Sequence, residues 1–413
     1  MKYIRTYGDY NSWKLDYSDT SRGFRLKPTL YKYSDVNIES KILLETDDPR
    51  KHGDSTYIRI YIDSDIEFSF YIGNKPGDTQ TTMTCTIDWG DGVIEDKNIT
   101  ADDKGFKLSH SYTGRSFRMI ELYNVERDYS IVGDGANTKS LISPIDSVKR
   151  VVLGGSVVNI GEQAFSECSS ITSVHIPNSV SSIDYDAFYN CTSLTSVNIP
   201  EGITLGDCVF QGCSSLTSIH IPNSFNSIGD WIFSECRGFT SIHIPEGITT
   251  IEYGMFADCT SLTSVYIPES TITIEDSVFK NCTSLKSVYI PEGVTTIGDT
   301  TYEGVFENCS SLTSVYIPKS VTSIGCNAFK GCSSLTSIDI PEGVTTIDDG
   351  TFNNCTSLSS VSLHSDMPPI LNGFAFDYLP ANGILHIKRG VGTNWEWEAF
   401  LGYFDNWRIV EDL

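Results

Sequence analysis

The chain has 413 residues and a formal net charge of −24 at pH 7. This length exceeds what one ordinary hydrophobic core supports, so it predicts two or three domains or a repeat array. The strong negative charge argues against a nucleic-acid partner, whose phosphates would be repelled, and against a basic patch for acidic membranes. Hydrophobic residues make up 39% of the chain, which is enough for a packed interior.

The segment from Met1 to Tyr7 lacks the apolar stretch of a secretory signal, and no run of about 18 apolar residues occurs anywhere in the chain. We therefore expect no membrane span. A signal that has been removed and export without a signal are both compatible with this start.

Residues 1–54 are aromatic and charged, which is unlike the composition of a disordered linker. The aromatic residues include Tyr3, Tyr7, Tyr10, Trp13, Tyr17, Phe24, Tyr31 and Tyr33. Because chain ends fray unless they are docked, we interpret this region as a segment that packs on its own domain or on a partner in a larger assembly.

Residues 55–147 are predicted to form an upstream β domain. The run Ile58–Ile62 predicts a strand, and Trp-Gly-Asp-Gly at 89–92 predicts a turn, followed by His-Ser-Tyr at 110–112. These motifs resemble the PKD-type, immunoglobulin-like β-sandwich. The resemblance implies a spacer or a binding module. Asp88 and Asp91 would hold calcium, as in some members, or form the turn, and the turn role is the commoner one.

The region after residue 147 repeats a unit of 23 residues. Two successive units begin with Ser-Leu-Thr-Ser-Val-Tyr-Ile-Pro at Ser261 and Ser-Leu-Lys-Ser-Val-Tyr-Ile-Pro at Ser284. Each unit also carries Phe-x-x-Cys, at Phe165/Cys168, Phe188/Cys191, Phe210/Cys213, Phe233/Cys236, Phe256/Cys259, Phe279/Cys282, Phe306/Cys309, Phe329/Cys332 and Phe352/Cys355. The step between cysteines is shorter by one residue before Cys213 and longer by four before Cys309.

Each unit contains a short strand with one apolar face. In the unit that starts at Ser261, Val265 and Ile267 are expected to point inward, while Ser264 and Tyr266 point outward. The proline that follows each strand ends pairing, because it has no N–H to donate. One unit cannot bury its apolar face alone, so stacked units are predicted to form a solenoid with one parallel strand per unit.

These elements resemble the BspA-like leucine-rich repeats of bacterial surface proteins, also called the Treponema pallidum type. The sequences Ser-Leu-Thr-Ser-Val-x-Ile-Pro, Val-Thr-x-Ile-Gly and Ala-Phe-x-x-Cys carry the resemblance over residues 148–363. It implies adhesion or protein binding without catalysis. The expected fold class is therefore mainly β, with about nine 23-residue repeats, the PKD-like sandwich upstream and a C-terminal cap over residues 364–413.

The nine cysteines of the Phe-x-x-Cys sites, called the ladder cysteines below, admit three interpretations: metal ligands, disulfides or core residues. Metal sites need clustered ligands such as C-x2-C pairs, which are absent from the sequence, and a chain of disulfides would strain the regular coil. Because a thiol behaves as a small hydrophobic group, we interpret the ladder cysteines as core residues. Cys85, Cys208 and Cys326 fall outside this pattern.

Residues 364–413 depart from the repeat. Pro368 and Pro369 interrupt its rhythm, and Ile384–Ile387 predicts a last strand. Aromatic residues follow at helix-like spacing, namely Trp395, Trp397, Phe400, Phe404 and Trp407. Solenoids need an atypical unit over their exposed apolar end, and the BspA-like family implies a closure of this kind, so we interpret the segment as a cap.

The outward strand position carries the candidate binding residues. In chain order it holds His175, Asn198, His220, His243, Tyr266, Tyr289, Tyr316, Asp339 and Ser362. Neighbours at ~4.8 Å would form a histidine-rich half and a three-tyrosine stripe. One interpretation is a binding face, because tyrosine suits interfaces and aromatic faces stack on sugars; the other is β-propensity with cross-strand aromatic pairing.

Under the binding interpretation, the ligand-binding residues are His175, His220, His243, Tyr266, Tyr289 and Tyr316. His220 and His243 could bind a metal ion, but solvated surface histidines are the commoner case. We therefore predict no metal and no cofactor.

No catalytic pattern such as Gly-x-Ser-x-Gly, His-Glu-x-x-His or a phosphate-binding loop occurs in the sequence. We expect a non-enzymatic adhesion protein at a bacterial surface that recognises a protein or a glycan. The alternative is a structural or receptor-binding component of a bacteriophage particle, as part of a fibre, a tail or a head decoration. The missing signal and the docked N-terminal segment favour that alternative, and an enzyme is a distant third.

Overall fold

The computed structural model describes residues 58–413, with gaps at 65–66, 75–78, 80, 102–104, 113–115, 124, 126–128, 132–146, 226–227, 299–302, 392–396, 398–399 and 405. The predicted docking segment, residues 1–54, lies outside the described residues and stays a prediction. The chain divides into two compact units, Met1–Asp48 and Pro49–Leu413, and the fold described below belongs to the second unit.

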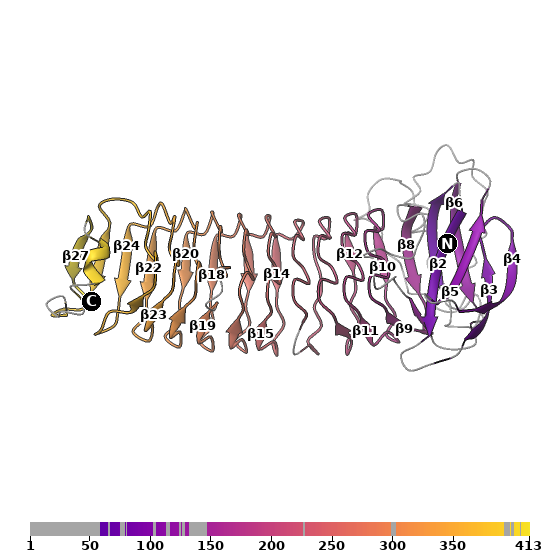
Figure 1. Ribbon diagram of the computed structural model, residues 1–413, viewed down its shortest axis with the longest axis horizontal. Helices are drawn as coiled ribbons and strands as arrows, with labels where there is room; N and C mark the ends of the chain where they lie inside the picture. The colour runs from indigo at the N-terminus through magenta and orange to yellow at the C-terminus, as the bar shows by residue number, and fades with distance from the viewer. Residues whose placement is uncertain are drawn as a thin grey trace, which may run out of the picture. The chain divides into compact units, whose positions relative to one another are not determined.

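The described part of the chain is mainly β, as predicted, and most of it is a row of stacked coils (Figure 1). Seven strands precede the coils: β1 (Ile58–Ser64), β2 (Glu67–Asn74), β3 (Thr82–Asp88), β4 (Ile94–Thr100), β5 (Phe106–Ser111), β6 (Ser116–Tyr123) and β7 (Tyr129–Ile131). From β8 onward, most coils place one strand on a first face and another on a second face; the coil of His220 has only an isolated bridge, and β26 and β27 have no described strand opposite them.

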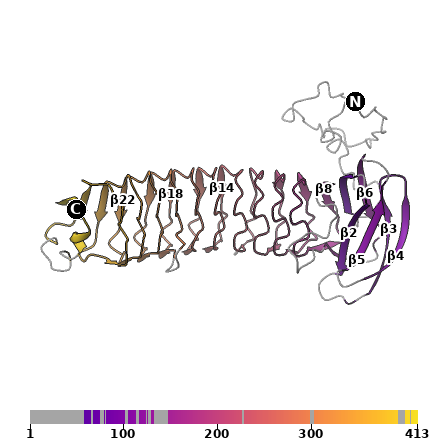
Figure 2. The same ribbon diagram turned by 45° about the horizontal axis from the view of Figure 1, so that its top comes forward.

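The first face carries the strand that begins each predicted repeat. Its strands are β8 (Val148–Leu153), β10 (Ser173–His175), β12 (Ser196–Val197), β14 (Ser241–His243), β16 (Ser264–Tyr266), β18 (Ser287–Tyr289), β20 (Ser314–Tyr316), β22 (Ser337–Ile340), β24 (Ser360–Leu363), β26 (Ile384–Ile387) and β27 (Arg408–Glu411). Figures 1 and 2 show β8, β14, β18 and β22 following one another in a single row. All pairings between neighbouring coils on this face are parallel, as predicted.

The second face carries shorter strands. They are β9 (Val157–Ile160), β11 (Ser182–Ile183), β13 (Thr204–Leu205), β15 (Thr250–Ile251), β17 (Thr273–Ile274), β19 (Thr296–Ile297), β21 (Ser323–Ile324), β23 (Thr346–Ile347) and β25 (Ile370–Leu371). Strands β15 to β25 form one parallel six-stranded sheet, in which each isoleucine pairs with the equivalent residue of the next coil. These inward isoleucines are fully buried at Ile274 and Ile297, which closes the core on this side.

A column of phenylalanine rings fills the space between the two faces. Successive rings from Phe165 onward stack nearly parallel, with centroids 5.1–6.0 Å apart. The column does not stop at Phe352, because Phe376 stacks on it at 5.1 Å. The ring column thus continues past Leu363, the predicted end of the repeat. The coil geometry continues without a Phe-x-x-Cys signature, since Asp377 to Leu379 follow Phe376 and no cysteine comes after them.

The ladder cysteines lie in the core, as predicted. All are buried and none is in a disulfide. Each thiol from Cys191 to Cys355 donates a hydrogen bond to the phenylalanine carbonyl of the preceding coil; for example, Cys259 Sγ lies 3.2 Å from Phe233 O. The thiol therefore fills a small apolar space and adds a second hydrogen bond to a carbonyl that already accepts one from a backbone N–H of its own coil, as Phe233 O does from Cys236 N. Cys85, Cys208 and Cys326 are buried as well.

This burial predicts slow thiol labelling. A thiol reagent applied to the native protein should modify few of the 12 cysteines, whereas labelling in denaturant should reach all of them. Mass spectrometry of the two samples measures the difference. Rapid labelling of the ladder cysteines in the native state would show that they are not in the core.

The residue before each ladder cysteine turns the backbone into the left-handed region. Asn281 and Asn308 have φ of 59° and 61°, and Gly212 has φ of 74°. Asparagine and glycine tolerate this conformation better than other residues. Asn308 Nδ2 also donates to Asn281 Oδ1 of the preceding coil at 3.0 Å, so the turn itself forms a polar ladder.

The strands upstream of the repeat are continuous with both faces of the solenoid. β1 pairs antiparallel with β8, whereas β7 pairs in parallel with β9 and antiparallel with β2, so both faces continue into the upstream strands. The predicted strand at Ile58–Ile62 is confirmed as part of β1. The predicted boundary at residue 147 thus falls inside two continuous sheets, and the assignment of this region to the PKD type stays a prediction.

The two upstream motifs meet in the structure. The fully buried Trp89 stacks on His110 with ring centroids 5.0 Å apart, and Tyr112 Oη donates to Trp89 O at 2.9 Å. Asp88 Oδ1 accepts from Gly90 N at 2.8 Å, while Asp91 Oδ2 lies 2.8 Å from His110 Nε2. Asp91 Oδ1 also accepts from Val93 N at 3.2 Å, so both carboxylates bond backbone N–H groups of the turn, which favours the turn role over calcium binding.

The C-terminal segment covers the end of the ring column. Trp397 and Phe400 are buried, and Phe404, in the short 3-10 helix η3 (Gly402–Phe404), packs tilted on Phe376 with centroids 4.9 Å apart. The predicted strand at Ile384–Ile387 is confirmed as β26. The sequence did not predict β27, which adds one more parallel strand beyond it.

Candidate binding surface

The outward position of the first face places the candidate residues on the surface. Tyr266, Tyr289 and Tyr316, called the tyrosine strip below, end strands β16, β18 and β20, with 43%, 51% and 44% of each side chain exposed. The inward neighbours Ile267 and Val288 are buried, so the alternation of the strand fixes which side chains face outward. The tyrosines therefore have no packing role in the core.

The three rings of the tyrosine strip do not form one continuous stack. They belong to two separate stacked pairs, one of which includes His243. Tyr289 and Tyr316 stack with centroids 5.4 Å apart and planes 5° apart, whereas Tyr266 stacks on His243 at 4.7 Å. Among the described residues, no ring contact joins Tyr266 to Tyr289. The backbone pairing shows the same grouping, because β14 pairs with β16 and β18 pairs with β20, while no described ladder joins β16 to β18.

The tyrosine hydroxyl groups reach carboxylates of the preceding coil. Tyr266 Oη donates to Glu246 Oε1 at 2.7 Å, and Tyr316 Oη donates to Glu292 Oε1 at 2.6 Å. These hydrogen bonds are the main reason that the pKa of Tyr266 and of Tyr316 is raised. Loss of solvent contact, followed by the charges of Glu269 and Glu292, raises the pKa of Tyr289.

Glu246, Glu269 and Glu292, called the glutamate row below, were not predicted as site residues. Each follows the proline that ends the strand, and each is exposed. The sequence did contain a signal, since Ile-Pro-Glu recurs in these units. The sequence pattern does not show that Glu246 and Glu292 meet tyrosine hydroxyl groups, because this contact depends on the path of the backbone around the coil.

The predicted histidines are exposed, and none of the ring contacts among the described residues joins two of them. His243 stacks on Tyr266, whereas His220 forms a single bridge with Asn198, and Asn198 separates His220 from His175 in the stack. Within the described ranges, no cluster of three or more His, Cys, Asp or Glu could hold a metal ion.

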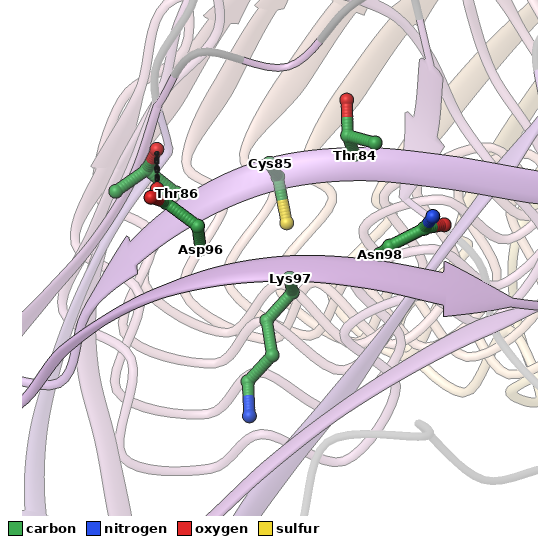
Figure 3. A pocket seen from close by; sticks show the side chains of 6 residues that line it. All are labelled: Thr84, Cys85, Thr86, Asp96, Lys97 and Asn98. Carbon is green, nitrogen blue, oxygen red and sulfur yellow. Dashed lines mark hydrogen bonds between the residues drawn. The ribbon is translucent and has the colours of Figure 1, made fainter.

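A pocket on the upstream hairpin contains a cysteine but no activated nucleophile. It lies between β3 and β4 and is lined by Thr84, Cys85, Thr86, Asp96, Lys97 and Asn98 (Figure 3). Thr86 Oγ1 donates to Asp96 Oδ1 at 2.8 Å. Burial raises the pKa of the Cys85 thiol to about 11, so it is protonated and a poor nucleophile at neutral pH.

The repeat region matches a known family. The sequence profile described as "BspA type Leucine rich repeat region" matches in six copies, at residues 143–205, 186–305 and 299–381. The chain belongs to this BspA-type leucine-rich-repeat family. The matched residues also extend past Leu363, in agreement with the additional coil that carries Phe376. Among curated protein sequences, none matches this chain.

Solved structures of leucine-rich-repeat proteins are similar to the chain in sequence. One from Bacteroides ovatus is 26% identical, over 62% of this chain and 88% of its own length, with a TM-score of 0.29. The Treponema pallidum leucine-rich-repeat protein is 30% identical over 45% of this chain and 77% of its own, with a TM-score of 0.33. A leucine-rich cell surface protein from Faecalibacterium prausnitzii is 24% identical over 61% and 92%, also with a TM-score of 0.33. These TM-scores are low, and the family assignment rests on the repeat profile.

No helix in the described part of the chain has the length and apolar character needed to cross a membrane.

Proposed function

We propose that this chain is a non-enzymatic adhesion protein that recognises a protein or glycan partner through the tyrosine strip. The observation that carries the proposal is the placement of Tyr266, Tyr289 and Tyr316 at an exposed position that the core does not constrain. Tyrosines give a rigid, amphipathic surface at small entropic cost, which suits recognition. The histidines at the same position, above all the stacked His243, would extend the contact.

Membership of the BspA-type family supports a binding role over catalysis. The ladder thiols are candidate nucleophiles by type, but they are buried and protonated, since burial raises the pKa of Cys213 to about 12. We place the protein at a bacterial cell surface. The bacteriophage alternative rests on residues 1–54, which lie outside the described residues, whereas the cell-surface role rests on the repeat.

The proposal is tested by changing all three residues of the tyrosine strip to serine. The wild-type chain is first screened against immobilised extracellular proteins and glycans, and the strongest interaction is then measured with the triple variant. Loss of central anchors costs ~2 kcal/mol or more, so we expect binding to weaken by at least ~30-fold. Surface changes alter stability by about 0.5 kcal/mol each, so the melting temperature should stay close to that of the wild type.

A matched control changes the same outward position in coils without tyrosine. Asn198→Ser combined with Asp339→Ser alters exposed residues at the same repeat position and leaves the tyrosine strip intact. This control should bind like the wild type. If the triple variant keeps its fold and its full affinity, the tyrosine strip is not the binding site.

A further inference from the structure

The glutamate row places three carboxylates beside the tyrosine strip, and no basic side chain among the described residues pairs with them. Within the described ranges, Glu246, Glu269 and Glu292 form no ion pair with lysine, arginine or histidine. Other acids in the solenoid do find partners: Glu307, for example, contacts both Lys280 and Lys330. The carboxylates of the glutamate row instead accept hydrogen bonds from tyrosines or face solvent. Their charge is therefore not neutralised within the described structure.

Aromatic faces and carboxylates lie side by side here. The hydroxyl groups of Tyr266 and Tyr316 each donate a hydrogen bond to a glutamate. Each of these two rings therefore has a carboxylate next to its hydroxyl group. A cation over a tyrosine ring is attracted by the negative face of the ring, and a carboxylate within reach adds an ion pair. Stacking covers one face of each ring, but about half of each tyrosine remains exposed, so the rings are accessible from solvent. This combination suits lysine and arginine side chains.

We propose that the tyrosine strip and the glutamate row together bind an extended, basic segment of a partner protein. The inference rests on the proposed function and specifies the partner: lysine or arginine side chains lie against the rings while their charged ends meet Glu246, Glu269 and Glu292. The net charge of −24 on the whole chain would draw such a partner in by long-range attraction.

The limits of the surface are marked by two lysines. Lys319 occupies the position of the glutamate row in the next coil, so the acidic border ends after Glu292. Lys286 precedes β18 and lies at the opposite end of that strand from the glutamate row. The proposed cation-binding surface therefore spans the coils from β14 to β20. Its glutamates lie at the C-terminal ends of the first-face strands, directly after the prolines.

The experiment compares two double variants of the full chain. Glu246→Gln with Glu292→Gln removes two negative charges beside tyrosines. Glu201→Gln with Glu342→Gln removes two negative charges at the same repeat position, where the next coil carries His220 or Ser362 at the outward position. The two variants have the same net charge and change exposed glutamates at the same repeat position, so they differ chiefly in their proximity to the tyrosine strip.

The probe is a fluorescent peptide of alternating lysine and glycine, with a glutamate–glycine peptide and a neutral oligosaccharide as comparison arms. We expect the lysine peptide to bind the wild type, and the Glu246/Glu292 variant to bind it about tenfold more weakly. The Glu201/Glu342 variant should weaken binding by no more than about twofold, the small effect typical of screened surface charges.

Three results would overturn this inference. Equal weakening in both variants would mean that only the net charge attracts the peptide. Absence of lysine-peptide binding by a folded wild type would exclude a basic partner for this surface. Binding of the neutral oligosaccharide that is lost in the triple tyrosine variant but kept in the Glu246/Glu292 variant would retain the proposed binding role and assign it to a glycan instead.

Discussion

The variant Phe256→Ala is expected to lower the free energy of unfolding by ~3–5 kcal/mol, because it removes a buried ring and leaves a cavity. Phe256 is fully buried and lies between Phe233 and Phe279, with centroid distances of 5.8 Å on both sides. In a solenoid each coil is held only by its neighbours, so one missing ring weakens two interfaces. Denaturant unfolding followed by circular dichroism measures the change.

The control for this variant is Tyr289→Ser, a loss of a comparably large aromatic side chain from the surface. Tyr289 is half exposed, so we expect a change within about 0.5 kcal/mol. A Phe256→Ala protein as stable as the Tyr289→Ser protein would contradict the role of the ring column as the core. If Phe256→Ala does not fold, Phe256→Leu, which keeps most of the apolar volume, should fold with an intermediate loss.

Alkaline pH is expected to unfold the solenoid steeply. Burial raises the pKa of the ladder thiols from Cys191 to Cys355, and Cys213 and Cys355 reach about 12 from an ordinary value of 9.0. Because the neutral thiol is the form that fits the core, this stabilisation is complete below pH ~9 and is lost as the pH rises toward the folded-state pKa. Each thiol contributes ~1.4 kcal/mol per pH unit in that window, so eight together remove on the order of 10 kcal/mol per unit.

The measurement is unfolding as a function of pH under reducing conditions, with the ultraviolet absorbance of thiolate recorded in parallel. Thiolate should appear together with unfolding and not before it. Replacing one ladder residue, as in Cys259→Ala, should make the pH dependence shallower by about one proton. Thiolate formation near pH 9 in a protein that stays folded would contradict the burial of the ladder cysteines.

The sequence by itself determined the repeating core. Phe-x-x-Cys and Ile-Pro recur at a nearly constant step, and a constant step in a solenoid places equivalent residues one above the other. The burial of Phe256 and Cys259, the exposure of Tyr266 and the parallel pairing of β-strands therefore follow from the pattern. The pattern failed where its signature was lost, since Phe376 continues the column without a cysteine.

Only the tertiary structure decided how the surface side chains meet. The hydrogen bond between Tyr266 and Glu246 joins residues 20 positions apart in the sequence. Whether these two side chains come within hydrogen-bond distance depends on the path of the backbone around a whole coil. Likewise Tyr266 stacks on His243 and Tyr289 on Tyr316, although all three tyrosines occupy the same repeat position. Core positions are fixed by burial, which the hydrophobic pattern encodes. Surface contacts depend on small differences in backbone position, which a repeat pattern does not encode.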